Sequence, residues 1–564
     1  MNKIAPIGNT LPVAGSANAD RKFKVGIVGA GSAGLFTAMI FDHLKENFGL
    51  DVEYEILERN GRDRVGGRLY TYNFPRGEEH HYFDVGAMRF PNIAIMSRTF
   101  ALFRELDMDF CDQREKPDPW KKQTRPYKVR KPVKGDLIPY YLNGPNQVTL
   151  FNGVPVSNAK GLSADMFGIT GLSPEYILLP FCSSQANSHS ISSQIADDIM
   201  NHAIHEFTDV YYKRGPEAFW KLLTQEGDAY SVRHFLARAI PLVDHPTIEF
   251  LETLKYGKGW YDQSFTELVL QSLDHESQEA EVKWWCVEGG AQEIAKNMAA
   301  SLKQTSALKF DKRVTAMSYI DHDNDGEKTG PFDKVEVKVD GERTPRIYDA
   351  VFNSVPLGAM EHMQLEGLNL NWGTKQAIRN LAYGSACKVG IRFRTMWWVK
   401  DGLNVFSGGI SKTDLPLRWC VYPSYNIHDD PNRPAVLLAS YTWGQEADRL
   451  GALINGASPH NEEELKQLLL HNLARLHTTD DASFEKLLKK LNDEYIDHYA
   501  YDWSAHPGSI GAIAYFGPGQ FNNMYQWITR SNGKMMIIGE AASSHHAWVV
   551  GQLPCKTQDT VLSN

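Results

Sequence analysis

One arginine stands in a run of residues that is otherwise almost entirely apolar. The stretch FDVGAMRFPNI, residues 83–93, carries Arg89 among glycine and large apolar side chains. Arginine is rarely buried without a partner, and its planar guanidinium pairs bidentately with a carboxylate. Arg89 therefore indicates either a site that waits for a ligand carboxylate or an ion pair with a protein acid such as Asp84.

A glycine-rich turn near the N-terminus points to nucleotide binding. Residues 29–34 read GAGSAG, and they follow the apolar, β-branched run FKVGIV at 23–28. Gly29 permits a tight turn, and Gly31 lets the backbone approach a pyrophosphate. Gly34 lets the helix that follows pack closely on the strand, so the segment predicts a strand, a phosphate-binding turn and a helix.

An acid stands where such a motif places a ribose contact. The helix that begins at Ser32 and Ala33 would present free N–H groups and a positive dipole end to phosphates. A second strand-like run, VEYEILERN, ends at Glu58, which lies 24 residues beyond Gly34. Its carboxylate would accept hydrogen bonds from both ribose hydroxyls, with Arg59 beside it. This set predicts a dinucleotide site without separating NAD from FAD.

A second glycine segment separates these two cofactors by resemblance. Gly66, Gly67 and Arg68 follow shortly after the second strand. Two glycines let the backbone pass close to a ligand, and the fork of Arg68 can bind phosphate. Here the sequence resembles the flavin-dependent amine oxidases, in which a Gly-Gly-Arg segment lies over the FAD pyrophosphate. The resemblance implies FAD as the cofactor.

Length, net charge and cysteine content restrict the kinds of protein that could carry these residues. The 564 residues are too many for one core and suggest roughly three or four domain-sized units. A net charge of −9 argues against nucleic-acid binding, and no apolar run reaches the length of a membrane span. The six cysteines show neither paired nor metal-binding spacing, and the N-terminus lacks a signal-peptide core. We expect a cytoplasmic or other intracellular protein without a metal site.

Periodicity divides the chain into a helical part and strand-rich parts. Residues 151–280 are dominated by helical spacing of apolar residues, and strand-like runs recur in the second half. We assign five of these runs to an antiparallel sheet of a second, mixed domain: DKVEVKVDG, AVFNSV, KVGIRFR, LRWCVYP and AVLLASYTW. The predicted class is α/β plus α+β, with a Rossmann-type FAD-binding domain, a mixed-sheet substrate domain and a helical insert. The predicted segments are 22–90, 281–355 and 505–564 for the FAD-binding domain, 91–150 and 356–504 for the substrate domain, and 151–280 for the helical domain.

The C-terminal region narrows the resemblance to the L-amino-acid oxidases within the flavin monoamine oxidases. KMMIIGEAASSHHAWVVG, residues 534–551, resembles the end of that family. YGSACK at 383–388, KTDLPLRWCVYPSYN at 412–426 and SYTWG at 440–444 resemble the same family in the same order. The resemblance extends from about residue 22 to about residue 551.

The resemblance implies a role for each candidate substrate contact. Arg89 would bind the substrate carboxylate, and Tyr422 would donate a second hydrogen bond to it. Trp443 and Trp548 would form two walls around the reacting amino acid. The backbone carbonyl of Ala547 would accept a hydrogen bond from the substrate amine.

The same resemblance implies the remaining cofactor contacts. Lys388 would hold a water near flavin N(5) that assists reoxidation by dioxygen, and Glu540 would hold the ribityl chain. Val314 would make a backbone contact near the adenine. The contacts implied around the flavin ring are Met88, Arg89, Trp548 and Val549.

One segment departs from the family pattern. After Gly551 the family continues as a helix rich in small and apolar residues, whereas this sequence reads QLPCKTQDTVLSN. Pro554 disfavours a helix except in its first turn. This departure puts the tightness of FAD binding, and with it the activity, in question.

The implied activity is oxidative deamination of an L-amino acid by dioxygen, which yields a 2-oxo acid, ammonia and hydrogen peroxide. An amine or polyamine oxidase and an amino-acid 2-monooxygenase stay open as alternatives, as does a flavin-poor binding module. Asp262 and Glu267 could face the pocket from the helical insert and would then favour basic substrates. The expected partners are a small-molecule amino acid and dioxygen, without nucleic acid or membrane, and a homodimer stays open.

Overall fold

A computed structural model describes the chain over most of its length. The described residues are 22–111, 131–156, 193–239, 245–255, 257–275, 282–320, 334–400, 402–456 and 458–553. The turn-rich stretch DNDGEKTG at 323–330, whose composition predicts a hairpin tip, lies outside these ranges, as does nearly all of the segment that follows Gly551.

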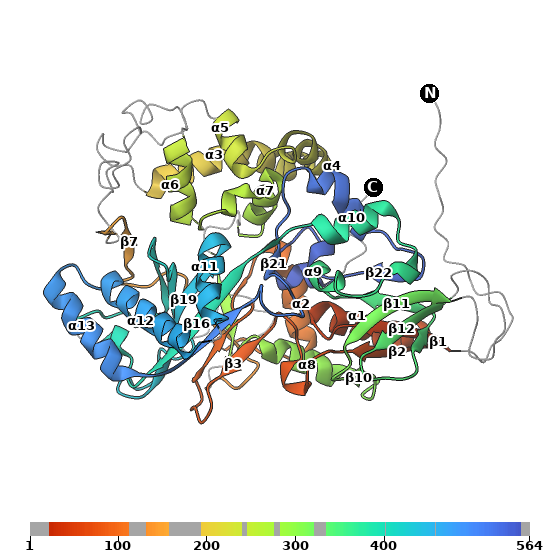
Figure 1. Ribbon diagram of the computed structural model, residues 1–564, viewed down its shortest axis with the longest axis horizontal. Helices are drawn as coiled ribbons and strands as arrows, with labels where there is room; N and C mark the ends of the chain where they lie inside the picture. Colours follow the sequence, from red (N-terminus) through yellow and green to blue (C-terminus); the bar gives the residue numbers. More distant parts are fainter. Residues whose placement is uncertain are drawn as a thin grey trace, which may run out of the picture.

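A five-stranded sheet lies at the lower right in Figure 1. β1 (Phe23–Val28) pairs in parallel with β2 (Val52–Leu57) on one side and with β14 (Ala350–Asn353) on the other. The outer strands are β10 (Leu308–Lys309) beside β2 and β22 (Met535–Ile537) beside β14. Most residues of these strands are buried, because both faces of the sheet are covered.

Different elements cover the two faces of this sheet. α1 (Ser32–Phe48) and α8 (Gln292–Ser301) contact each other and share one apolar core with the strands. The antiparallel strands β11 (Val314–Ile320), β12 (Lys334–Val339) and β13 (Arg346–Tyr348) contribute to a second core with residues of β1, β2 and β14. The assignment of β12 and β14 to the sheet of the second domain is therefore wrong, because β12 pairs with β11 and β14 pairs with β1.

The second large sheet has seven strands in the order β20-β16-β19-β18-β17-β7-β8. It is mostly antiparallel, with one parallel pair between β17 and β7. Helices α11, α12 and α13 lie beside it at the left of Figure 1 and share an apolar core with it. The bounds are β7 (Thr149–Phe151), β8 (Val154–Val156), β16 (Ala386–Phe393), β17 (Gly409–Thr413), β18 (Trp419–Tyr422), β19 (Ala435–Trp443), β20 (Tyr495–Asp502), α11 (Gly444–Ile454), α12 (Pro459–Leu476) and α13 (Asp481–Glu494).

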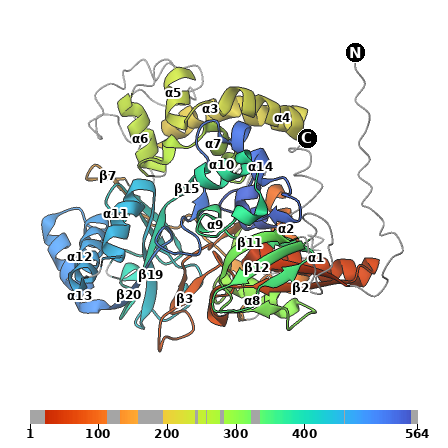
Figure 2. The same cartoon turned by 45° about the vertical axis from the view of Figure 1, so that its right-hand side comes forward.

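A helical layer lies above both sheets in Figures 1 and 2. It contains α3 (Ser193–Arg214), α4 (Pro216–Leu222), α5 (Val232–Ala239), α6 (His245–Lys255) and α7 (Phe265–Leu273). These helices lie within the segment 151–280 that the sequence assigns to a helical insert. No helix in the described ranges is long and apolar enough to cross a membrane.

A small three-stranded sheet joins segments that are far apart in the chain and whose pairing the sequence did not predict. β9 (Trp284–Val287) pairs with β5 (Phe90–Pro91) on one side and β6 (Leu137–Pro139) on the other. α2 (Ser97–Glu105) follows β5, and Phe100 and Phe103 pack in the same core as α1 and α8. The start of the predicted 91–150 segment thus packs with the parallel sheet.

Two other predicted boundaries also differ from the structure. The boundary at residue 150 falls inside the hairpin of β7 and β8, whose strands both extend the seven-stranded sheet. α9 (Leu357–Met360) and α10 (Trp372–Asn380) contribute to the core of β11 and β12 instead of the seven-stranded sheet. The remaining strands are short: β3 (Thr71–Asn73) pairs with β4 (Tyr82–Asp84), and β15 (Tyr383–Gly384) pairs with β21 (Ile513–Ala514). The last α-helix in the described chain is α14 (Gln526–Ile528).

Candidate active site

The glycine turn has the geometry that a bound pyrophosphate requires. Gly29 has φ +98°, and a Cβ on Gly34 would lie 2.0 Å from the carbonyl oxygen of Gly29. Gly31 forms a backbone bridge with Gly66 from the second glycine segment. The hydroxyl of Ser32 is buried without a hydrogen-bond partner among the described residues, and Ser32 is not among the residues that line the neighbouring cavity, unlike Gly31 and Ala33.

A cavity of about 180 Å³ opens beside this turn. Glu58 is buried at the end of β2, where its carboxylate accepts hydrogen bonds from the N–H groups of Ala30 at 2.8 Å and Asn60 at 2.9 Å. Burial and the charge of Arg313 lower the pKa of Arg59. The predicted cofactor contacts that line this cavity are Gly29, Gly31, Ala33, Glu58, Arg59, Gly67, Arg68, Val314 and Glu540.

Arg68 and Glu540 mark the place where this cavity meets a second one. Both residues line the first cavity and the second, which measures about 200 Å³. Arg68 donates to Glu540 at 2.8 Å and to the carbonyl oxygen of Ala512 at 3.0 Å. The sequence suggested that the guanidinium binds phosphate, but these two bonds already use part of its donors. Although burial alone would raise the pKa of Glu540, the charges of Arg68 and His546 lower it. The carboxylate is therefore ionised between the two cavities.

Lys388 projects from β16 into the second cavity. Its ammonium donates to the carbonyl oxygens of Asp84 at 3.0 Å and Gly86 at 2.7 Å, and it lies 4.4 Å from the ring centre of Tyr441. Burial lowers the pKa of Lys388 to about 7, although the carboxylate of Asp84 opposes the shift. Only 2% of the residue is exposed, so Lys388 is not a solvated lysine on the surface of its strand.

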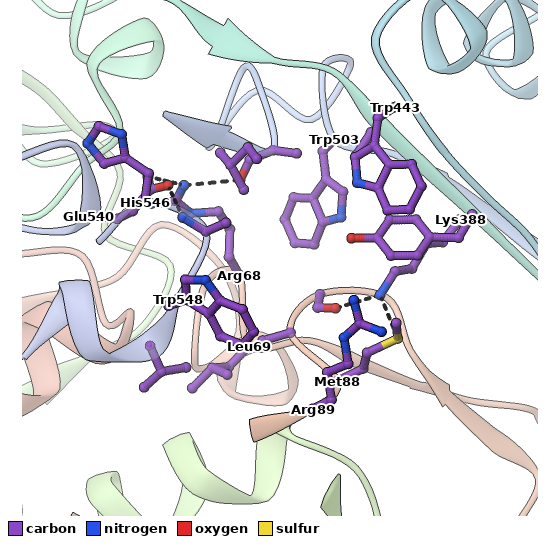
Figure 3. A pocket seen from close by; sticks show the side chains of 18 of the residues that line it. Arg68, Leu69, Met88, Arg89, Lys388, Trp443, Trp503, Glu540, His546 and Trp548 are labelled. Carbon is purple, nitrogen blue, oxygen red and sulfur yellow. Dashed lines mark hydrogen bonds and ion pairs between the residues drawn. The ribbon is translucent and has the colours of Figure 1, made fainter. Parts of the chain in front are cut away.

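Arg89 lies at the edge of the same cavity, as Figure 3 shows. Its guanidinium lies 5.5 Å from the ring of Trp284 and 5.8 Å from the ring of Trp419. Asp84 instead accepts hydrogen bonds from Thr71 and from a backbone N–H, so the proposed internal ion pair does not form. Among the described residues no carboxylate pairs with Arg89.

Tyr140 is a neighbour of Arg89 that sequence reasoning missed. It follows β6, where its N–H donates to the carbonyl oxygen of Trp284 at 2.9 Å. Burial raises the pKa of Tyr140 to about 12, while the nearby charge of Arg89 works in the opposite direction. The hydroxyl is buried and has no hydrogen-bond partner in the described parts of the chain. The sheet of β5, β9 and β6 brings the two residues together from 51 positions apart.

Tyr422 does not face this cavity, and the prediction that it would is wrong. Its hydroxyl lies 2.5 Å from Nε2 of His477 and 2.9 Å from the hydroxyl of Ser411, inside the core beneath α12. Successive side chains of a strand point to opposite faces. Trp419 and Val421 of β18 therefore pack on the cavity side, whereas Tyr422 packs on the other side.

Aromatic rings form most of the remaining cavity wall, and two of them were expected from the sequence. Trp443 and Trp548 both line the cavity, and Trp443 contacts Trp419 edge-to-face at 4.5 Å. Figure 3 shows Trp443 and Trp503 on one side and Trp548 across from Lys388. Ala547 has φ +69°, a left-handed backbone conformation that residues other than glycine rarely adopt. Its N–H donates to Glu540 at 2.9 Å. Met88 and Val549 complete the predicted residues that line this cavity.

The two acids proposed from the helical insert do not line the cavity. Glu267 is buried and accepts hydrogen bonds from Nδ1 of His546 at 2.9 Å, and Asp262 is mostly exposed beside Arg233. The insert instead contributes Gln271, His275 and Trp260 to the wall. Within the described ranges no group of three or more His, Cys, Asp or Glu side chains is arranged to hold a metal ion, and the four described cysteines, Cys111, Cys286, Cys387 and Cys420, are buried thiols.

Comparison with known proteins gives a consistent assignment. A family model described as flavin containing amine oxidoreductase matches residues 34–171 and 201–552. The chain is 34% identical over 559 residues to L-amino-acid oxidase 4 of Hebeloma cylindrosporum, which covers 94% of this chain and 80% of that protein.

Solved structures of amine oxidases share the fold. The structure resembles a putrescine oxidase bound to putrescine, with a TM-score of 0.63 and 17% identity over 94% of this chain and 97% of that chain. It also resembles a cyclohexylamine oxidase from Brevibacterium oxydans, with a TM-score of 0.60 and 15% identity over 96% and 99% of the two chains. This chain therefore belongs to the family of flavin containing amine oxidoreductases, which bind FAD.

Proposed function

We propose that this protein catalyses the oxidative deamination of L-amino acids, with dioxygen as the electron acceptor. The observation that carries the proposal is Arg89, a guanidinium at the cavity wall that no carboxylate pairs with in the described chain. An amine substrate has no use for such a group, whereas an amino acid supplies the planar carboxylate that matches it. The relative named L-amino-acid oxidase 4 supports the same reading.

The residues of the first cavity fit FAD. The glycine turn would meet the pyrophosphate, and Glu58 would accept hydrogen bonds from ribose hydroxyls. Val314 lines the part of this cavity nearest to β11, as expected for an adenine contact. When bound, FAD supplies the electron acceptor for the two electrons that leave the substrate.

The chain's own residues position the substrate. Arg89 binds the carboxylate bidentately, and the buried hydroxyl of Tyr140 lies beside the guanidinium and helps to position it. The carbonyl oxygen of Ala547 accepts a hydrogen bond from the amine, which must be neutral when its Cα–H bond breaks. Trp443 and Trp548 restrict the substrate between them and exclude water. The reaction gives an imino acid that water hydrolyses to a 2-oxo acid and ammonia.

Lys388 serves the step that involves dioxygen. Its ammonium is held by two carbonyl oxygens at the cavity wall, and its third contact is the sulfur of Met88 at 3.6 Å, a weak acceptor that a water can replace. A positive charge at this place stabilises negative charge that develops on dioxygen as it is reduced to hydrogen peroxide.

A substrate panel tests the proposal. The purified flavoprotein is offered L-amino acids, the matching D-amino acids and the matching decarboxylated amines, while hydrogen peroxide, 2-oxo acid and amide products are measured. Hydrogen peroxide and 2-oxo acid from L-amino acids support the proposal. Strong activity on the amines alone would establish an amine oxidase, and amide with carbon dioxide would establish the monooxygenase outcome.

A further inference from the structure

Two polar side chains of the helical insert line the substrate cavity next to each other. Gln271 lies in the last turn of α7, and His275 follows the end of that helix. The two positions are four residues apart, and the N–H of His275 still bonds to the carbonyl oxygen of Ser272 at 3.1 Å.

The orientation of the Gln271 amide is fixed from behind. Its Nε2 atom donates to a carboxylate oxygen of Glu267 at 3.2 Å and to the amide oxygen of Gln263 at 3.3 Å. A carboxylate engaged in this way can only accept, so the amide nitrogen must face it. The amide oxygen of Gln271 then faces the cavity as an acceptor without a described partner.

The tautomer of His275 is fixed in a similar way. Its Nδ1 atom lies 2.8 Å from the carbonyl oxygen of Gln271, so Nδ1 carries the hydrogen. Part of His275 is exposed to solvent. The protein around the ring and the charge of Arg89 lower its pKa, so the ring favours its neutral form. The other ring nitrogen, Nε2, is therefore a second acceptor at the cavity wall.

The nearby acids are not available to a cationic side chain. Glu267 pairs with His546 and Asp274 pairs with His545 at 2.7 Å, both within buried contacts. Glu540, the acid that lines this cavity, pairs with Arg68. A charged ammonium or guanidinium would thus enter a site that holds Arg89 and Lys388 and has no free carboxylate among the lining residues.

We infer that the preferred substrate has a side chain ending in a primary carboxamide, as in L-glutamine and L-asparagine. The two N–H bonds of one carboxamide nitrogen match the two neutral acceptors of Gln271 and His275. A side-chain carboxylate of the same shape would place oxygen atoms against these acceptors, and an aliphatic side chain would leave both of them desolvated and unpaired. The inference rests on the proposed function, because it concerns the same cavity.

The test compares kcat/KM for L-glutamine, L-asparagine, L-glutamate, L-methionine and L-lysine on the wild-type flavoprotein. The better carboxamide substrate should exceed L-methionine, L-glutamate and L-lysine by roughly 10-fold or more. Gln271→Leu and His275→Phe should each reduce the ratio of L-glutamine to L-methionine by about 10-fold, since each removes one acceptor. Ser272→Ala, a change on the same helix away from the cavity wall, should leave that ratio unchanged.

The outcomes separate the inference from the proposed function. If the wild type oxidises L-methionine or L-glutamate as well as it does the carboxamides, the inference is wrong, whether or not the variants fold. An unchanged ratio in a folded Gln271→Leu variant would contradict it as well. Activity on amines without activity on any amino acid would instead refute the proposed function.

Discussion

The ammonium of Lys388 donates a 2.7 Å hydrogen bond to the carbonyl oxygen of Gly86, three residues before Arg89. A second bond to the carbonyl oxygen of Asp84 fixes the same segment against β16. The lysine thus anchors the segment that carries the guanidinium, in addition to facing the cavity. Its replacement should disturb both the substrate site and the step with dioxygen.

Lys388→Met should slow reoxidation of the reduced enzyme by dioxygen more than it slows reduction by substrate. In the wild type, reoxidation should become slower as pH rises through about 7, because the ammonium loses its charge there. The variant should lose this pH dependence in stopped-flow traces. The variant should also unfold more easily, since each buried carbonyl left without a donor costs about 1–3 kcal/mol. Slowing confined to the reductive half would contradict the assignment.

Arg89→Ala should reduce kcat/KM for an amino acid by roughly 150- to 5,000-fold, because a charge-assisted bidentate pair in a desolvated site is worth about 3–5 kcal/mol. Arg89→Lys should restore only part of the loss, since a point charge cannot reproduce the planar fork. The decarboxylated amine serves as the control substrate and should be oxidised equally well by wild type and variant. Equal losses on acid and amine would mean that Arg89 is structural.

Tyr140→Phe should reduce kcat/KM for the amino acid by about 5- to 30-fold, because the buried hydroxyl beside Arg89 helps to position the guanidinium. The matched control is Tyr422→Phe, which changes a tyrosine of the same size that faces the opposite side of its sheet. That variant should lose stability through its contact with His477 but should keep the KM of the wild type. A rise in KM for Tyr422→Phe alone would restore the original sequence-based assignment.

His80 should stabilise the fold in a pH-dependent way. Although burial alone would lower it, hydrogen bonds to Asp429 at 2.6 Å and Glu288 at 3.1 Å raise the pKa of His80 to about 9. A raised pKa means that the stabilisation is complete below about pH 6.5 and is lost as pH rises through 9. His80→Gln should therefore lower the free energy of unfolding by up to about 3 kcal/mol at pH 6 and by much less near pH 9.5. A change at the exposed His460 on α12 provides the comparison, and a pH-independent effect at His80 would refute the prediction.

Ala547→Gly should increase stability, because the native backbone at this position has φ +69°. The left-handed conformation costs an alanine about 1–2 kcal/mol, and glycine removes this cost. Part of the gain is lost because glycine has a larger conformational entropy in the unfolded chain. A net gain of about 0.5–1 kcal/mol is expected in denaturant unfolding of the enzyme. A loss of stability would show that the alanine methyl group makes packing contacts of greater value.

The sequence by itself determined the parts of the protein that depend on local spacing. The glycines of 29–34 and the acid at Glu58 define a strand, turn, helix and strand whose periodicities are readable within about 35 residues. The structure places Gly29, Gly31 and Glu58 around one cavity, as the motif predicts. Arg89 was also found from the sequence, because a charged residue within an apolar run requires a reason, whereas Lys388 was implied by the family resemblance.

Only the tertiary structure decided which side chains meet in the substrate cavity. A difference of one position along β18 moves a side chain to the other face of the sheet, so Tyr422 could not be placed from its motif alone. Tyr140 reaches Arg89 through pairing of β5, β9 and β6, and no local pattern announces such a contact. Glu267 is withdrawn from the cavity by His546, which lies 279 positions away, and Gln271 takes its place at the wall. Periodicity specifies which face of an element is buried, whereas the partner of each buried polar group is chosen by packing between distant segments.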